Sequence, residues 1–264
     1  MWRGAARAAN PRGRATTPMR KTLDWQIATL TNVRTETAKA KSFTLSLPDW
    51  TPHRAGQHYD IRLTAGDGYQ AQRSYSIASE PERKGEVDLT VERIEDGEVS
   101  TYMHDVLITG DKLEVRGPIG GYFVWEASML EPLLLIAGGS GVVPLMSMLR
   151  HRRAAGARHP ARLLYSSRTF EDIIFRDELD VLQREANHPE VFHTLTRSQP
   201  SGWKGYSRRI DEAMLAEVAE PLGRGAQVFI CGPTLLVESA ADLLVTIGFK
   251  SDQIRTERFG PTGG

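Results

Sequence analysis

The sequence contains very little cysteine and no long apolar run. Cys231 is the single cysteine among 264 residues, which excludes a disulfide within one chain. It also excludes an iron–sulfur cluster held by one chain alone, because such a cluster needs about four thiolates. No apolar run approaches the ~20 residues needed to cross a bilayer, so we expect no membrane span. If the protein handles single electrons, the metal lies elsewhere, and we expect no metal site in this chain.

The sequence also has no net charge, since 33 Lys and Arg balance 33 Asp and Glu. Five of the arginines lie in residues 1–20, so the remainder has 28 basic against 33 acidic residues, a formal charge of −5. This balance argues against a nucleic-acid partner, because phosphate binding depends on basic patches. A local basic patch for an acidic partner stays open, with Arg150, Arg152 and Arg153 as candidates; the alternative is that these three cap a helix.

Residues 1–20 contain no acid and lack the apolar centre of a secretory signal. We interpret them as a disordered Arg-rich tail or an upstream start, since Met19 lies just before the first alternating segment. The alternative is a mitochondrial transit peptide, whose composition is similar. A cytoplasmic protein is the default expectation.

The length and the 40% apolar and 25% charged composition predict two globular domains, residues 21–126 and 127–264, joined near Glu126–Glu131. In the first domain, short alternating stretches separated by turn residues predict a six-stranded antiparallel barrel. The predicted strands are Gln26–Val33, Ser42–Leu47, Gln57–Leu63, Gln72–Ala78, Glu86–Arg93 and Lys112–Arg116. Helical spacing predicts one helix over Val99–Leu107, with Ser100 as its cap.

The second domain alternates apolar runs with helical segments, which predicts a five-stranded parallel α/β sheet. The predicted strands are Pro132–Ala137, Arg162–Ser166, Val191–Thr196, Gln227–Ile230 and Ile254–Phe259, and the predicted helices are Pro144–Arg153, Phe170–Ala186, Ile210–Val218 and Pro233–Ile247. Pro144 suits a first helical position, Thr169 and Asp172 read as a capping box, and Gly248 reads as a helix stop.

Two glycine-rich turns follow strands of this second domain. Gly138-Gly139-Ser140-Gly141-Val142-Val143-Pro144 opens a helix, and its glycines allow a ligand to approach backbone amides that attract phosphate. It lacks the third glycine and the later acidic residue of a dinucleotide fingerprint, so a purely structural turn is the alternative. Cys231-Gly232-Pro233 repeats the arrangement, and there Cys231 is more typical of a small buried side chain than of a nucleophile.

Two further motifs are short. Ser167-Arg168 ends the second strand of the sheet, where Arg168 could pair with a 2′-phosphate; this favours NADPH over NADH, with a solvated arginine as the alternative. Arg73-Ser74-Tyr75-Ser76 lies on a barrel strand, so Arg73 and Tyr75 face one side and Ser74 and Ser76 the other. Taken alone, it could be an ordinary half-exposed strand.

The order of these motifs resembles the ferredoxin–NADP⁺ reductase superfamily over about residues 22–260. The resemblance implies a flavin-binding barrel followed by a nicotinamide-binding domain, with FAD and NADPH or NADH as cofactors. It implies that Arg73 holds the FAD pyrophosphate, that Tyr75 packs on the isoalloxazine and that Ser76 hydrogen-bonds near N5. Phe259, in Glu257-Arg258-Phe259-Gly260, resembles the aromatic residue that shields the flavin, although the following Pro261-Thr262-Gly263-Gly264 departs from plant-type members.

The same resemblance assigns the remaining candidate residues. Those expected around the reacting atoms are Ser76, Cys231 and Phe259. Those expected to bind FAD are Arg73, Ser74, Tyr75, Ser76, Val91, Arg93, Gly97, Val99, Ser100 and Thr101. Those expected to bind the nicotinamide coenzyme are Gly138, Gly139, Ser140, Gly141, Pro144, Ser167, Arg168, Cys231, Gly232 and Pro233.

The resulting expectation is a monomeric FAD-dependent NAD(P)H oxidoreductase, in which bound FAD takes a hydride from NAD(P)H. Electrons then pass in trans to a ferredoxin, a cytochrome or an oxygenase component, because no ferredoxin domain is recognisable in the chain. One alternative is a flavin reductase that releases reduced flavin. Another is a flavin-binding electron-relay or regulatory subunit that does not oxidise nicotinamide. His53, His58, His104 and His193 have no assigned role.

Overall fold

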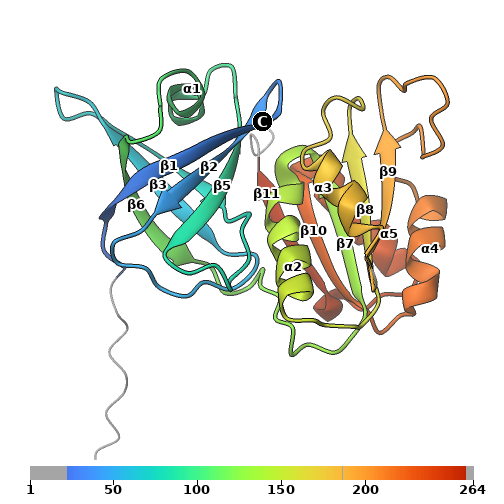
Figure 1. Ribbon diagram of the computed structural model, residues 1–264. Helices are drawn as coiled ribbons and strands as arrows, with labels where there is room; N and C mark the ends of the chain where they lie inside the picture. Colours follow the sequence, from blue (N-terminus) through green and yellow to red (C-terminus); the bar gives the residue numbers. More distant parts are fainter. Residues whose placement is uncertain (1–22, 186, 260–264) are drawn as a thin grey trace, which may run out of the picture.

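The computed structural model describes residues 23–185 and 187–259, and it contains two sheets side by side (Figure 1). The predicted tail, residues 1–20, lies outside the described residues. The first sheet is antiparallel with strand order β4-β3-β6-β1-β2-β5, and the second is parallel with order β11-β10-β7-β8-β9. The predicted combination of an antiparallel barrel and a parallel α/β sheet is confirmed.

All six predicted strands of the barrel are present. They are β1 (Gln26–Thr37), β2 (Ala40–Ser46), β3 (His58–Thr64), β4 (Gln70–Ser76), β5 (Glu86–Glu92) and β6 (Lys112–Ile119). A bridge between Ile77 and Leu89 connects the end of β4 to β5 and closes the barrel. Alternating apolar side chains, including Leu30, Phe43 and Leu89, fill its interior.

The predicted barrel helix is α1 (Glu98–Asp105), but its predicted cap is wrong. Gly97 occupies the N-cap position, and no side chain caps the helix. Ser100 lies one turn later, where its hydroxyl donates to the Gly97 carbonyl at 3.3 Å and accepts from the Ile94 amide at 3.1 Å. The hydroxyl therefore shapes the turn that enters the helix and leaves the first helical amides free.

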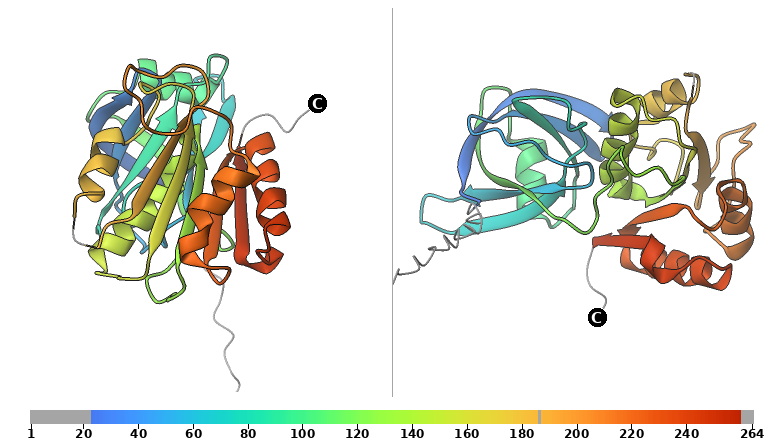
Figure 2. Two further views of the ribbon diagram at one scale, coloured as in Figure 1. Left: turned by 90° about the vertical axis from the view of Figure 1, so that its right-hand side faces the viewer. Right: turned by 90° about the horizontal axis from the view of Figure 1, so that it is seen from below.

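The second sheet separates two helical layers. Its strands are β7 (Leu133–Gly138), β8 (Ala161–Ser167), β9 (Glu190–Leu195), β10 (Gln227–Pro233) and β11 (Ile254–Phe259). Its helices are α2 (Val142–Ala154), α3 (Arg176–Leu182), α4 (Glu212–Ala219) and α5 (Thr234–Thr246), with short 3₁₀ turns η1 (Gly139–Gly141), η2 (Glu220–Leu222) and η3 (Ser251–Gln253). Helices α2 and α3 cover the face toward the barrel, and α4 and α5 cover the other (Figure 2).

The third helix differs most from the sequence prediction. We expected a helix over Phe170–Ala186 behind a capping box, but the chain forms turns until Phe175, which has a left-handed φ of 59°. Thr169 and Asp172 do contact each other, through their side chains at 3.1 Å, without starting a helix. Ile173, Ile174 and Phe175 are buried in the core, so tertiary packing overrides the local helical pattern.

Two smaller expectations concern helix ends. Pro144 is the third rather than the first residue of α2, a position that still requires no intrahelical hydrogen bond from its nitrogen. Gly248 follows the end of α5 with a φ of +100°, as expected of a helix stop.

Helix α2 fastens the second domain to the barrel segment that follows β4. The Ser147 hydroxyl donates to the Ser79 carbonyl at 2.7 Å, and Arg150 donates to the Ala78 carbonyl at 2.7 Å. Arg150 also forms two hydrogen bonds with Glu178, at 2.8 and 2.6 Å. Ala78, Trp125 and residues of α2 belong to one apolar cluster, so the two domains share a continuous core.

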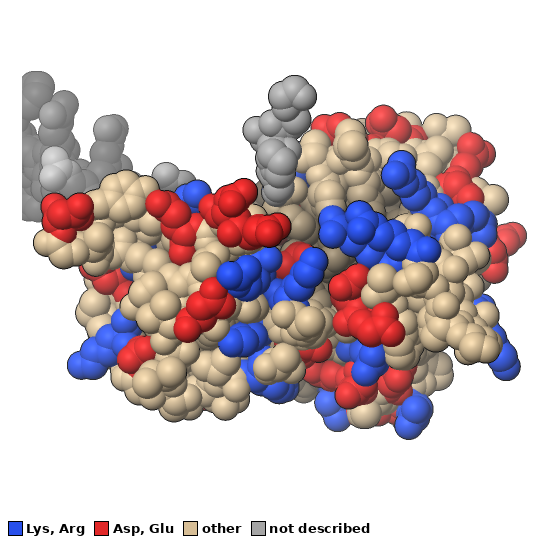
Figure 3. All heavy atoms as spheres, turned by 90° about the horizontal axis from the view of Figure 1, so that it is seen from above, with Lys and Arg blue, Asp and Glu red and all other residues tan. Residues whose placement is uncertain are grey.

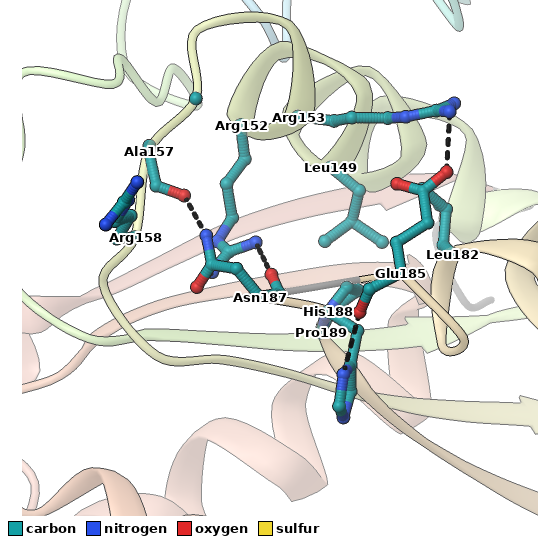
Figure 4. A pocket seen from close by; sticks show the side chains of 11 residues that line it. Leu149, Arg152, Arg153, Ala157, Arg158, Leu182, Glu185, Asn187, His188 and Pro189 are labelled. Atoms are coloured by element: carbon teal, nitrogen blue, oxygen red, sulfur yellow. Dashed lines mark hydrogen bonds and ion pairs between the residues drawn. The ribbon is translucent and has the colours of Figure 1, made fainter.

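These contacts exclude Arg150 and Arg152 from the basic patch that the sequence left open on α2. The Arg150 side chain is 11% exposed and Arg152 is 4% exposed, so neither is available to a partner. Arg152 instead donates to the carbonyls of His159 and Asn187, and it lines an open pocket with a volume of about 760 Å³ (Figure 4). This pocket lies beside the start of β8 and β9, away from the edge at which the glycine-rich turns follow β7 and β10.

None of the helices in the described part of the chain combines the length and the apolar character that a membrane crossing requires.

We predict that Arg150→Ala lowers the free energy of unfolding by roughly 2–4 kcal/mol, because it leaves Glu178 and the Ala78 carbonyl without their partner at the domain junction. The measurement is the denaturant midpoint in guanidinium chloride. Arg153→Ala is the matched control, since Arg153 pairs with Glu185 while its own side chain is 57% exposed, and should cost about 0.5 kcal/mol or less. Equal losses for the two variants would contradict the role given to Arg150.

Candidate active site

The two glycine-rich turns touch each other through their backbones. A Cβ atom on Gly141 would stand 2.1 Å from the Cys231 carbonyl oxygen, and one on Gly232 would stand 3.1 Å from the Gly138 Cα. A Cβ on Gly138 would stand 2.7 Å from Leu236 in α5. Any side chain at Gly141 would therefore separate the turns. The pair forms one backbone-lined surface at the carboxyl edge of the sheet, where parallel α/β sheets bind ligands.

The Arg73–Ser76 motif forms the second half of β4, the first strand in the order of the barrel sheet. Arg73 and Tyr75 pair with Ile61 and Tyr59, which are fully buried in the barrel. Because paired residues point to the same face, Arg73 and Tyr75 share one side of β4, as expected, and that side faces the core. Arg73 is exposed and donates only to the Gln72 carbonyl, at 2.7 Å, among the described residues. Burial raises the pKa of Tyr75 to about 12.

Ser74 faces the outside of the barrel and has a structural partner. Its hydroxyl donates to Asp60 at 2.6 Å, and Arg116 donates to the other oxygen of that carboxylate at 2.7 Å. Asp60 is 5% exposed, and hydrogen bonds from Ser74 and Arg116 overcome its burial and lower its pKa. Ser74 therefore anchors β4 to β3, and only its backbone remains available to a ligand.

The turn that enters α1 offers a different kind of binding surface. Gly97 has an extended backbone, and the amides of the first helical turn, including those of Val99 and Ser100, have no intrahelical acceptor. Thr101 donates its backbone amide to Gly97 and its hydroxyl to Ile94. The free amides and the positive end of the helix dipole suit a phosphate.

Two candidate residues beside this turn already have partners in the barrel. Arg93 forms an ion pair with Asp105, with nitrogen–oxygen distances of 3.3 and 2.9 Å. Val91 is fully buried, and its carbonyl is 2.8 Å from His104 Nε2. The contacts of Arg93 with Asp105 and of Val91 with His104 hold the end of β5 against α1. The Val91 side chain packs in the barrel core.

The ends of β8 and β9 bring two arginines together. The Ser167 hydroxyl is buried and has no hydrogen-bond partner among the described residues. Arg168 is exposed, and its carbonyl accepts from the Arg197 amide at 2.9 Å. Neither Arg168 nor Arg197 has an acidic partner within residues 23–185 and 187–259. Figure 3, viewed from this end, shows basic side chains gathered over this domain and along the junction.

The second turn lies beside a half-buried glutamate, Glu257, on β11. Cys231 pairs with Glu257, and Pro233 pairs with Phe259, on adjacent parallel strands. Cys231 is 2% exposed, and burial, followed by the charge of Glu257, raises the pKa of its thiol. Burial also raises the pKa of Glu257 to about 7, and its Oε2 has no hydrogen-bond partner among the described residues. Phe259 packs against the apolar cluster that contains Cys231.

Glu257 and Arg197 were absent from the residues expected from the sequence. Strand alternation could have identified Glu257, because it lies on the same face of β11 as Phe259. Arg197 follows β9, and its contact with Arg168 becomes apparent only when the β8 and β9 loops are seen side by side.

Comparison with known proteins identifies both halves. The oxidoreductase FAD-binding domain model matches residues 27–124, and the oxidoreductase NAD-binding domain model matches residues 135–242. Ferredoxin–NADP reductase B of Sorangium cellulosum is 37% identical over 209 residues, which cover 78% of this chain and 84% of that protein.

Other relatives are longer or more distant. The glycine betaine monooxygenase reductase subunit of Chromohalobacter salexigens is 33% identical over 79% of this chain, which spans only 56% of that protein. The crystal structure of a ferredoxin NADP⁺ reductase from Neisseria gonorrhoeae with bound FAD and NADP superposes with a TM-score of 0.76 at 21% identity. That match covers 89% of this chain and 98% of the other, and it shows a common fold.

We predict that Glu257→Gln stabilises the protein at high pH. Because the pKa of Glu257 rises from 4.5 to about 7 on folding, the folded protein retains a proton between these values that the unfolded chain releases. The free energy of unfolding therefore falls as pH rises through this window. The variant should be about 2–3 kcal/mol more stable than wild type at pH 8 and equal to it near pH 4.

Denaturant unfolding at pH 4, 6 and 8 measures this difference. Glu238→Gln serves as the control, since the Glu238 side chain is 54% exposed and only 3.8 Å from Arg258. Parallel pH curves for wild type and Glu257→Gln would show that the buried carboxyl does not titrate in this range.

Proposed function

The chain belongs to the ferredoxin–NADP reductase family of FAD- and NAD-binding oxidoreductases, and we propose that it passes electrons from NAD(P)H through bound FAD to a separate redox protein. The observation that carries the proposal is the contact between α2 and the barrel. Helix α2 begins at the first glycine-rich turn. Its side chains donate hydrogen bonds to the carbonyls of Ala78 and Ser79, which lie two and three residues after Ser76. The proposed flavin motif and the proposed coenzyme turn are therefore held in a fixed position relative to each other.

The barrel residues have the chemistry that FAD requires. The exposed guanidinium of Arg73 and the free amides at Gly97–Thr101 would hold the pyrophosphate through charge-assisted and backbone hydrogen bonds. Tyr75, half-buried on the core side of β4, would pack on the isoalloxazine ring. Ser76 would donate its hydroxyl near N5.

The second domain has the chemistry that the coenzyme requires. The backbone surface formed by Gly138–Gly141 and Gly232 would admit a flat ring and a pyrophosphate. The unpaired Ser167 hydroxyl and the adjacent Arg168 would bind a 2′-phosphate, and Arg197, whose backbone amide donates to the Arg168 carbonyl, would add a second guanidinium. This arrangement favours NADPH over NADH.

When bound, FAD supplies the hydride acceptor and the capacity to release electrons singly. The protein's task is to orient the two rings and exclude water. Cys231 gives a small, neutral surface beneath the second turn, and Phe259 would shield the flavin from solvent until the nicotinamide displaces it. Glu257, whose pKa is near 7, can hold a proton beside Cys231.

The electron acceptor is proposed from the relatives' names. Reductase subunits of monooxygenases and a ferredoxin–NADP reductase lie among them. A ferredoxin or an oxygenase component, reached in trans by a monomeric reductase, is the partner that we propose.

Anaerobic titration of the purified protein with NADPH and NADH tests this function. We expect a retained flavin absorption band that bleaches at about one equivalent of NADPH. A protein purified without flavin, but active with added flavin, would support the flavin-releasing reductase instead. A retained band that neither coenzyme bleaches would overturn the proposed catalysis and favour a relay subunit.

We predict that Arg168→Ala raises the KM for NADPH at least about tenfold and changes the KM for NADH less than twofold, because only NADPH carries the 2′-phosphate. Steady-state reduction of ferricyanide with each coenzyme measures both constants. Arg224→Ala is the control. Arg224 lies in the loop before β10, at the other end of the strand from the glycine-rich turn, and its guanidinium stacks on the ring of Phe249. Equal effects on the two coenzymes would contradict the assignment of Arg168.

A further inference from the structure

A carboxylate from the barrel reaches the first glycine-rich turn. Glu92 is the last residue of β5, and its Oε2 lies 3.9 Å from the position that a Cβ on Gly139 would take. Gly139 has a left-handed φ of 54°, and because it has no side chain, its backbone faces the Glu92 carboxylate directly. Glu92 is half-buried, and its side chain has no hydrogen bond or ion pair to any residue that the structure describes. It is therefore an unneutralised charge at the junction of the two domains.

The charge of Glu92 also affects a residue of β8. Burial raises the pKa of Tyr165, and the negative charges of Glu92 and Asp172 raise it further. Tyr165 lies on β8 and pairs with Ala137 on β7, directly before the turn. The Glu92 carboxylate therefore acts on the carboxyl edge of the sheet between β7 and β8. Its chain neighbour Arg93 does not neutralise it, because Arg93 pairs with Asp105.

The opposite end of the proposed coenzyme surface has the opposite charge. Arg168 and Arg197 lie at the ends of β8 and β9, and neither has an acidic partner among the described residues. A ligand that spans from Gly139 to Arg168 would meet a carboxylate at one end and two guanidinium groups at the other. An oxidised nicotinamide dinucleotide has matching charges, with a cationic ring at one end and phosphates toward the other.

We propose that Glu92 discriminates between the two redox states of the nicotinamide and favours the oxidised one; this inference rests on the proposed function. When the C4–H bond of the dihydronicotinamide breaks, its two electrons and hydrogen form the N5–H bond of the flavin, and the nicotinamide becomes a cationic pyridinium. A fixed carboxylate attracts the cationic ring and leaves the neutral ring unaffected. Because this attraction increases as the hydride departs, Glu92 assists transfer away from the coenzyme.

Binding measurements on the flavin-loaded protein test this role without turnover. The probes are NADP⁺, whose ring is cationic, and 1,4,5,6-tetrahydro-NADPH, whose ring is neutral and donates no hydride; both have the same phosphates. Glu92→Gln keeps the shape of the side chain and removes its charge. We expect the variant to bind NADP⁺ roughly three- to tenfold more weakly and tetrahydro-NADPH within twofold of wild type.

Glu95→Gln is the matched control, since it makes the same change in net charge three residues later at an exposed position. It should leave both affinities within twofold of wild type. An unchanged ratio of the two affinities in Glu92→Gln overturns the inference, whether both probes weaken equally or neither does. A wild-type protein that retains flavin but binds neither probe overturns the proposed function and this inference with it.

Discussion

The attachment of α2 to the barrel determines the geometry on which the proposed chemistry depends. This helix begins at the first glycine-rich turn, and two side chains from its middle donate hydrogen bonds to the carbonyls of Ala78 and Ser79. Those carbonyls follow β4 almost immediately, so a single helix spans from one cofactor motif to the other. A shift of the helix by one residue would move the turn by about 1.5 Å, a large error for hydride transfer.

The carboxyl edge of the second sheet is built almost without side chains where the turns meet. Gly141 has no room for a Cβ atom against the Cys231 carbonyl, and a Cβ on Gly232 would be in tight contact with Gly138. Polar side chains instead surround this surface: Glu92 from the barrel, Glu257 from β11 and Arg168 from β8. The backbone therefore sets the shape of the site, and the surrounding side chains set its charge. A substitution of one of these side chains can change the electrostatics of the site without changing its shape.

The sequence predicts the architecture because the two halves have different hydrophobic periods. Alternation identified six barrel strands, and apolar runs identified five parallel ones; Ile254–Phe259 was predicted to the residue. Local patterns failed where tertiary packing decides, as at Phe175, whose left-handed backbone delays α3, and at Arg150, which looked like a surface residue but joins the domains. Glu92 and Arg197 could not be identified, because their neighbours in space are distant in sequence.

The shared core between the domains has a consequence for biosynthesis. Ala55, Ala78, Phe123 and Trp125 belong to the barrel and its exit segment, yet they share one apolar cluster with α2 and with Phe229 of β10, which follow them in the chain. A ribosome therefore releases the complete barrel before its cover exists. During that interval the nascent chain exposes a hydrophobic patch, which is the kind of surface that chaperones bind and that promotes aggregation. Slow emergence of the residues after 126 from the ribosome would prolong this exposure, whereas prompt emergence of α2 would end it.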